Sequence, residues 1–258
     1  MSDGSVHLHL TGDRATVTFD RPAAHNAMTW KMYDELAAIC RQLATHDDLR
    51  AVMFRGTGGK AFVAGTDIAQ FADFKSGDDG IRYEAMIDEY VACVESLPVF
   101  TVALVEGYAV GGGLALAAAC DARLATADAK FSVPIARTLG NCLSMANMRR
   151  LVHAVGASRA KRMLMLAESL SAEQALDAGF VMDIVSREDM DSHANALCDR
   201  VAQYAPLTLR AAKESVRRII HLEGDDADDL VRLCYGSADF RNGVRAFTSK
   251  VPARWQGR

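Results

Sequence analysis

The first part of the chain alternates between two hydrophobic periods. Residues 6–10 and 15–19 hold β-forming side chains that alternate or cluster around a turn at 11–14, which predicts a β-hairpin. The next hydrophobic residues recur at helical spacing, and Thr29 stands before them as a capping residue. A helix is therefore expected over about 30–45.

Two short hydrophobic runs, 51–56 and 100–105, are typical of buried strands in a parallel sheet. A glycine-rich turn and then a helical pattern follow each run. This repeated order predicts an α/β architecture with a largely parallel sheet, in which ligands bind at the carboxyl ends of the strands. The other elements expected in this half are helices over about 67–74 and 80–96 and strands at 122–125 and 130–133.

From about residue 144 onward the pattern is mainly helical, with one last strand at 180–185. The expected helices are 144–153, 157–168, 171–178, 187–203, 206–221, 226–236 and 237–249. The C-terminal third is therefore interpreted as a helical appendage. Its apolar faces need a cover, either from its own core or from another subunit.

Composition narrows the class of protein. The 258 residues are 50% hydrophobic and 24% charged, with a net charge of −4 and no basic block, so we expect neither nucleic acid nor a membrane as partner. The six cysteines lack Cys-x-x-Cys spacing, which favours free thiols over a disulfide framework. The sequence shows no signal-peptide pattern and no apolar run long enough to span a bilayer, so a cytoplasmic protein without a metal is expected.

Two glycine-rich turns suggest a ligand site. In 62-FVAGTDI-68 and in 107-GYAVGGGLAL-116 a turn follows a strand and opens a helix. Glycine leaves the backbone N–H uncovered, and the first N–H groups of a helix have no partner inside it. Two such turns on neighbouring strands can aim two N–H groups at one point and form an oxyanion hole. Alternatively, the glycines only permit tight packing between strand and helix. Their spacing matches neither the fingerprint of a dinucleotide-binding site nor a P-loop.

Several segments, taken in order, resemble the crotonase superfamily, which includes enoyl-CoA hydratases and isomerases. The resemblance covers nearly the whole chain. The segments are 21-RPAAHNAM-28, 60-KAFVAGTDIAQF-71, 103-ALVEGYAVGGGLALAAACDARLA-125, 131-FSVP-134 and 239-DFRNGVRAFTSKVPARWQGR-258.

The resemblance implies a crotonase (ClpP-like) spiral of β-β-α units in residues 1–195. A helical region at 196–258 would drive assembly into a trimer or into a hexamer made of two trimers. The implied ligand is an acyl-CoA thioester, with coenzyme A as part of the substrate and no separate cofactor. Its carbonyl oxygen would accept hydrogen bonds from the backbone N–H groups of Thr66 and Gly112.

The resemblance also implies a set of contacts to the acyl-CoA. These are His25, Asn26, Ala27, Lys60, Ala64, Gly65, Asp67, Ile68, Gly111, Ala115, Ile135, Phe247 and Lys250. Phe247 and Lys250 match positions that often reach the nucleotide in this family, sometimes from a neighbouring subunit. Alternative roles are a surface charge for either lysine and a helix cap for Asp67.

The chain departs from the family pattern at two positions. Hydratases of this family carry a glutamate in G-G-G-x-E and another in F-x-x-P-E, whereas this chain has Ala115 and Ile135, or Ala136 in a shifted register. Adding water needs one group to deprotonate water and another to protonate carbon. Ordinary hydration is therefore not expected, and a double-bond isomerase lacks its base as well.

Other residues near the site suggest other reactions. Arg137 can bind a substrate carboxylate in a bidentate manner, and decarboxylation needs no base in its first step; a structural salt bridge is the alternative. Asn141 can orient a substrate or shape the turn beside Gly140. On the helix that borders the family's acyl pocket, Tyr83, Glu84, Glu89 and Tyr90 are candidates to face inward. The competing interpretation is an acyl-CoA-binding protein without turnover, and thioester hydrolysis lacks an identifiable base.

Overall fold

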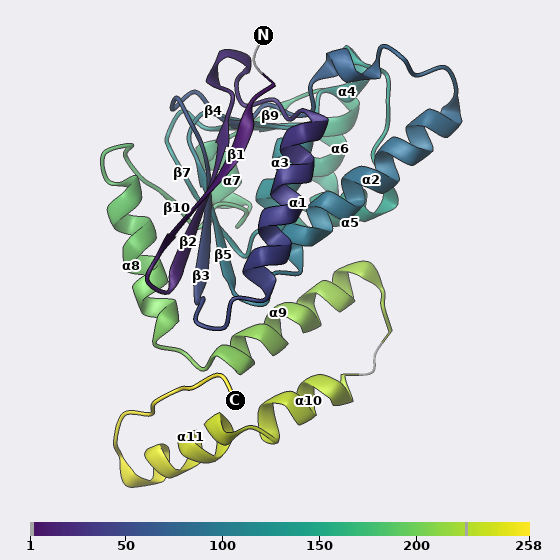
Figure 1. Cartoon of the computed structure of the whole chain (residues 1–258). Helices are drawn as coiled ribbons and strands as arrows, with labels where there is room; N and C mark the ends of the chain where they lie inside the picture. Colours follow the sequence, from purple (N-terminus) through teal and green to yellow (C-terminus); the bar gives the residue numbers. More distant parts are fainter. Residues whose placement is uncertain (1–2, 225–226) are drawn as a thin grey trace.

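Two β-sheets form the centre of the computed structural model, which describes residues 3–224 and 227–258 (Figure 1). The larger sheet has the strand order β1-β2-β3-β5-β7-β10, with β1 at Ser5–Thr11, β2 at Arg14–Asp20, β3 at Ala51–Gly56, β5 at Phe100–Val105, β7 at Ala122–Ala125 and β10 at Asp183–Ile184. The smaller sheet has the order β4-β6-β8-β9, with β4 at Ala61–Val63, β6 at Tyr108–Val110, β8 at Lys130–Ser132 and β9 at Ser169–Ser171.

Each successive unit of the chain contributes two strands, one to the larger sheet and one to the smaller sheet. Strands β3 and β4 precede α2 (Gly77–Glu95), β5 and β6 precede α3 (Gly112–Ala119), and β7 and β8 precede the next helices. Pairing within the large sheet is parallel from β2 onward, and only the β1–β2 hairpin is antiparallel there. The predicted parallel α/β architecture and its β-β-α repeat are therefore confirmed.

Helices cover both faces of the large sheet (Figure 1). The successive side chains of β5 point to opposite faces, so Val102 and Leu104 pack with α8 (Met190–Ala202) while Ala103 and Val105 belong to the main core. A strand buried on both sides has no polar alternation, which explains its continuous hydrophobic run.

The main core lies between the sheets and a group of helices. The helices between β2 and β10 are η1 (Pro22–Ala24), α1 (Trp30–Ala44), η2 (Ile68–Phe71), α2, α3, α4 (Ile135–Thr138), α5 (Met145–Val155), α6 (Ala157–Met165) and α7 (Ala172–Asp177). Thr29 caps α1 as predicted, because its Oγ1 accepts a hydrogen bond from Met32 N.

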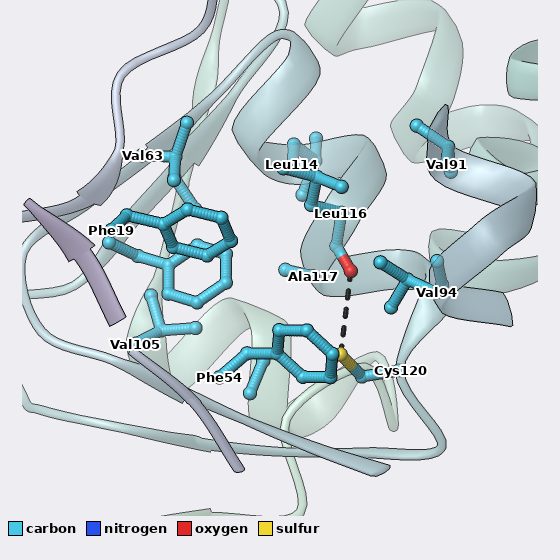
Figure 2. Packing of buried hydrophobic residues seen from close by; sticks show 14 of the residues in the cluster. Phe19, Phe54, Val63, Val91, Val94, Val105, Leu114, Leu116, Ala117 and Cys120 are labelled. Atoms are coloured by element: carbon cyan, nitrogen blue, oxygen red, sulfur yellow. Dashed lines mark hydrogen bonds between the residues drawn. The ribbon is translucent and has the colours of Figure 1, made fainter. Parts of the chain in front are cut away.

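Small side chains let α3 fit inside this core. Figure 2 shows Leu114, Leu116 and Ala117 between sheet residues such as Phe54 and the α2 residue Val94. A helix enclosed on all sides has no polar face. The alanine run is therefore explained by packing between a sheet and a neighbouring helix.

Three predicted boundaries change in the structure. The predicted helix at 67–74 is only the short 3₁₀ helix η2, and the strand at 180–185 shrinks to the two residues of β10. The predicted domain boundary between 195 and 196 falls inside α8, whose apolar residues pack on the large sheet. The core therefore extends to the end of α8.

The C-terminal arm consists of α9 (Pro206–His221), α10 (Asp228–Tyr235) and α11 (Ala238–Ser249), and it extends away from the sheets (Figure 1). The start predicted for α10, residue 226, lies outside the described residues. Two polar contacts connect α9 to the core: Lys213 Nζ lies 2.9 Å from Asp121 Oδ2, and His221 Nε2 lies 2.9 Å from Glu95 Oε2.

Two further predictions concern cysteines and membranes. All six cysteines are free thiols, in agreement with the interpretation from spacing. Within residues 3–224 and 227–258, no helix is both long and apolar enough to cross a bilayer.

Replacement of Asp121 by alanine should destabilise the fold. Asp121 Oδ2 accepts hydrogen bonds from Thr101 N at 2.8 Å and Thr101 Oγ1 at 2.9 Å, and Thr101 is fully buried. The orphaned donors should lower the free energy of unfolding by about 1–3 kcal/mol, measured in urea. Asp73→Ala, at an exposed position, should change it by less than about 0.5 kcal/mol; equal effects of the two variants would contradict this account.

Candidate functional site

The two glycine turns lie side by side because they follow paired strands. Strand β4 pairs in parallel with β6, with Ala61 opposite Tyr108 and Val63 opposite Ala109. The sequence predicted neighbouring strands here but placed the turns directly after β3 and β5. The structure instead inserts β4 and β6, so the turns occupy the carboxyl edge of the small sheet.

Glycines at these turns permit backbone contact that no side chain would allow. A Cβ on Gly113 would lie 1.9 Å from Val63 O, so the start of α3 rests directly on the end of β4. Gly65 and Gly111 have φ values of 89° and 52°, in the left-handed region that favours glycine. Met28 fixes the first turn, because its N donates to Gly65 O at 2.8 Å.

The backbone N–H groups of Thr66 and Gly112 lie close together at these turns. Gly112 is the first residue of α3, and a Cβ placed on it would lie 4.0 Å from Thr66 N. Among the hydrogen bonds of residues 3–224 and 227–258, none uses Thr66 N–H or Gly112 N–H as donor. A helix start adds partial positive charge to such donors. The arrangement can therefore receive a negatively charged oxygen.

Three hydroxyl groups surround the first donor. Thr66 Oγ1 lies 2.9 Å from the Tyr33 hydroxyl and 2.9 Å from the Tyr83 hydroxyl. Burial raises the pKa of Tyr33 well above its usual value and raises that of Tyr83 to about 12. Both phenols therefore keep their protons at neutral pH. Tyr33 was missed from the sequence, although a tyrosine inside a buried helix stripe signals a hydroxyl that needs a partner.

Aromatic rings form a wall next to the hydroxyl groups. The Tyr83 ring centroid lies 4.8 Å from that of Phe71, 5.8 Å from that of Trp30 and 6.1 Å from that of Phe74. These rings come from α1, η2, α2 and the segment between η2 and α2. They fix the position of Tyr83 and give this side of the site an apolar surface.

Of the four candidate residues on α2, Tyr83 contacts the first glycine turn and Glu84 contacts the start of α5. Tyr83 bonds to Thr66, and Glu84 Oε2 accepts a hydrogen bond from Ser144 N at 2.8 Å. Burial, together with nearby Asp88, raises the pKa of Glu84. Glu89 is exposed, and Tyr90 donates to Asp34 instead.

Among the described residues, no carboxylate lines the small cavity at Ala115. Ala115 lines a cavity of about 20 Å³ together with Gly111, Leu114, Ala118, Val133, Leu143, Asn147, Arg150 and Leu151. Arg150 is already paired with Glu95 at 2.8 Å. Ile135 is the first residue of the short helix α4.

The loop around α4 is exposed. Arg137 and Asn141 both lie on the surface of this loop. No ion pair of Arg137 is found in the described part of the chain, so a structural salt bridge does not account for it. The proposed contacts of both residues with a substrate stay predictions.

The predicted CoA contacts fall into three groups. His25 and Lys60 are exposed beside the first turn, and Lys60 O accepts a hydrogen bond from Tyr108 N. The second group belongs to the first turn and the segments next to it: Ala27, Ala64, Gly65 and Ile68. The third group, Phe247 and Lys250, belongs to the C-terminal arm, which lies away from both turns (Figure 1). One chain alone therefore does not bring the arm residues to the site.

Two of these predicted contacts have structural roles. Asn26 is fully buried, and its Nδ2 donates to Thr57 O at 3.0 Å and Ala61 O at 2.8 Å. A ligand contact through the Asn26 side chain is therefore corrected to a turn-forming role. Asp67 caps η2 and pairs with Arg21 at 2.7 Å, as its alternative interpretation predicted.

The β-β-α fold defines an α/β protein in which two adjacent glycine turns each carry an N–H group without a partner in residues 3–224 and 227–258. The family model for enoyl-CoA hydratase/isomerase matches residues 13–258. A short-chain-enoyl-CoA hydratase of Clostridium acetobutylicum is 27% identical over 254 residues, with 97% of each chain covered. A 2,3-dehydroadipyl-CoA hydratase of Escherichia coli is 30% identical over 246 residues, with 94% of each chain covered.

Solved structures agree with these sequence matches. An enoyl-CoA hydratase/carnithine racemase from Magnetospirillum magneticum has a TM-score of 0.88 at 27% identity, covering 100% of this chain and 97% of that one. The chain therefore belongs to the enoyl-CoA hydratase/isomerase family of the crotonase superfamily, whose members act on acyl-CoA.

Replacement of Gly112 by alanine should strain the site. The added Cβ would lie 2.7 Å from the buried Tyr33 hydroxyl, and such overpacking should lower the free energy of unfolding by about 1–3 kcal/mol in a urea titration. Gly80→Ala is the control, because a Cβ at this helical position meets open space and should stabilise by up to about 1 kcal/mol. A Gly112→Ala protein as stable as the wild type would refute the close approach.

Glu84→Gln should stabilise the protein increasingly as pH rises. The folded state raises the pKa of Glu84 above 4.5, so the folded carboxyl retains its proton where the unfolded one has lost it. The stability that Glu84 adds to the folded wild-type protein is fully present below the pKa of the unfolded state. It is lost as the pH rises through the higher pKa of the folded state. Glutamine stays neutral and still offers an oxygen to Ser144 N.

The measurement is the thermal midpoint of Glu84→Gln relative to wild type between about pH 4 and pH 8. The exposed Glu89→Gln on the same helix should give a difference that does not grow with pH. A flat profile for Glu84→Gln would mean that Glu84 titrates normally.

Proposed function

We propose that the protein binds an acyl-CoA thioester and stabilises its enolate with the N–H groups of Thr66 and Gly112. The observation that carries this proposal is the proximity of two N–H groups that have no partner in the described residues, with Thr66 N 4.0 Å from a Cβ on Gly112. An enolate carries more negative charge on its oxygen than the ground-state carbonyl does. Each donor therefore contributes on the order of 3 kcal/mol to the transition state.

The reaction is one that proceeds without the two glutamates of ordinary hydration. Ala115 and Ile135 hold no ionisable group, and hydration needs both an acid and a base. Two relatives described above carry hydratase names, but those names describe those proteins. Coenzyme A enters as part of the substrate, with no separate cofactor.

Decarboxylation of a carboxyacyl-CoA is the second candidate, because loss of CO₂ forms the enolate and no base is needed for this step. The exposed guanidinium of Arg137 supports it, since this side chain has no ion pair in the described part of the chain. A planar guanidinium suits bidentate binding of a carboxylate. Binding of acyl-CoA without turnover is the remaining alternative.

The arm supports assembly into a trimer or into a hexamer of two trimers. Exposed apolar residues extend along α9 and α11, including Ile219 at 66% and Phe247 at 86% exposure. Burial of these apolar side chains against a second copy would stabilise such an assembly. In the trimer, Phe247 and Lys250 of one chain approach the site of its neighbour. A cytoplasmic location fits a chain of this composition.

Three acyl-CoA probes should separate the candidate reactions. We expect the protein to leave crotonyl-CoA and 3-hydroxybutyryl-CoA unchanged at ordinary enzymatic rates. If decarboxylation is the reaction, malonyl-CoA is converted into acetyl-CoA; all products are followed by mass spectrometry. Arg137→Ala should abolish that conversion, whereas Arg200→Ala, at an exposed position of α8, should preserve it.

Each other result has a definite meaning. Hydration of crotonyl-CoA at ordinary rates would show that other groups replace the glutamates. Tight binding of all three probes without turnover would favour the binding protein, and no binding of any probe would refute the acyl-CoA site itself.

A further inference from the structure

Three hydroxyl groups from different elements border the proposed oxyanion hole. Tyr33 comes from α1, Thr66 from the first glycine turn and Tyr83 from α2. A Cβ on Gly112 would lie 2.7 Å from the Tyr33 hydroxyl and 3.6 Å from Thr66 Oγ1. The hydroxyl groups of Tyr33 and Thr66 therefore lie beside Gly112, and the Tyr83 hydroxyl is linked to them through Thr66 Oγ1.

The hydroxyl groups of Tyr33, Thr66 and Tyr83 form a hydroxyl chain, which has one more O–H proton than the hydrogen bonds within it use. Its three O–H groups form two bonds, Tyr33 to Thr66 and Thr66 to Tyr83, each of 2.9 Å. None of the three hydroxyls has another partner in residues 3–224 and 227–258. One O–H group is thus left to donate to an acceptor outside the chain.

Burial decides which end of the chain donates outward. Tyr33 is completely buried, whereas Tyr83 is only partly buried. A free O–H on Tyr33 would be a buried donor without an acceptor, which costs about 1–3 kcal/mol. Tyr33 therefore donates to Thr66, and the remaining O–H group belongs to Thr66 or to Tyr83. In the direction from Tyr33 to Thr66 to Tyr83, each bond also strengthens the next one.

We propose that Tyr83 is a third donor to the thioester oxygen, and that Tyr33 and Thr66 are positioning residues that direct its proton outward. This inference rests on the proposed function and adds a side-chain donor to the two backbone donors. No covalent step is involved, because Tyr83 donates a hydrogen bond and keeps its proton.

Two other features suit this role. Burial raises the pKa of Tyr83 to about 12, so its phenol is a donor and not a base at neutral pH. The surrounding rings of Trp30, Phe71 and Phe74 restrict its movement, and a donor fixed before the reaction needs no reorganisation. The site therefore stabilises charge strongly although positions 115 and 135 lack carboxylates.

The test is the infrared band of the carbonyl of bound butyryl-CoA labelled with ¹³C at the thioester carbon. Hydrogen bonds lower this frequency, so wild-type protein should shift the band below its position in solution. Tyr83→Phe should reverse roughly a third of the shift, because one of three donors is lost. Tyr33→Phe should reverse less, because it removes only the direction of the chain.

Tyr90→Phe is the matched control. Tyr90 lies on the same helix and stacks on Tyr33 at 5.1 Å, but its hydroxyl donates to Asp34 and does not touch Thr66. This variant should leave the band where the wild type has it. A general effect of tyrosine loss on folding would move both variants alike.

The outcomes separate the two proposals. A wild-type shift that is unchanged in Tyr83→Phe would overturn the role of Tyr83 and leave the backbone hole standing. A band at its solution position in the wild type would overturn the proposed function itself. If Tyr83→Phe does not fold, Thr66→Val is the second test, because it removes the hydroxyl that links the two tyrosines and keeps the backbone N–H. An unchanged band in Thr66→Val would also overturn the role of the three hydroxyl groups.

Discussion

The site depends on backbone contact between strand β4 and the segment that carries β6 and the start of α3. A Cβ on Gly107 would lie 2.0 Å from Lys60 O, and one on Gly113 would lie 1.9 Å from Val63 O. Glycine at both ends of this segment therefore lets the two chains approach more closely than any side chain would permit. This approach brings Thr66 N next to the first turn of α3, where the N–H groups have no partner inside the helix.

The same approach explains residues that otherwise look unrelated. Because α3 rests on β4 and is enclosed by α2 and the sheet, its side chains are small or purely hydrophobic, as Figure 2 shows for Leu114 and Ala117. Ala115 is thus compatible with dense packing, and it leaves the proposed reaction without a carboxylate on α3. Stabilisation of charge then falls on donors: two backbone N–H groups and, in our proposal, the hydroxyl of Tyr83. Such a site favours reactions limited by enolate stability over those limited by proton abstraction.

The sequence predicted the features that follow from periodicity and capping. The hairpin, the Thr29 cap and the buried strands at 51–56 and 100–105 match the structure. Strands β4 and β6 were missed because they lie within segments that the glycines marked as turns, and β9 was missed because its three residues show no period. The pairing of all three strands is set by distant segments. Asn26 was taken for a ligand contact because sequence shows a polar residue but not its buried acceptors. The Tyr33–Thr66–Tyr83 chain joins three distant segments, so no local pattern reveals it.

The most direct test of the account is a crystal structure of the protein with butyryl-CoA bound. The account predicts that the thioester oxygen lies about 2.7–3.1 Å from both Thr66 N and Gly112 N, the range of oxyanion-hole donors. An ordered thioester whose oxygen contacts neither nitrogen would contradict the central claim. It would mean that the glycines serve packing alone.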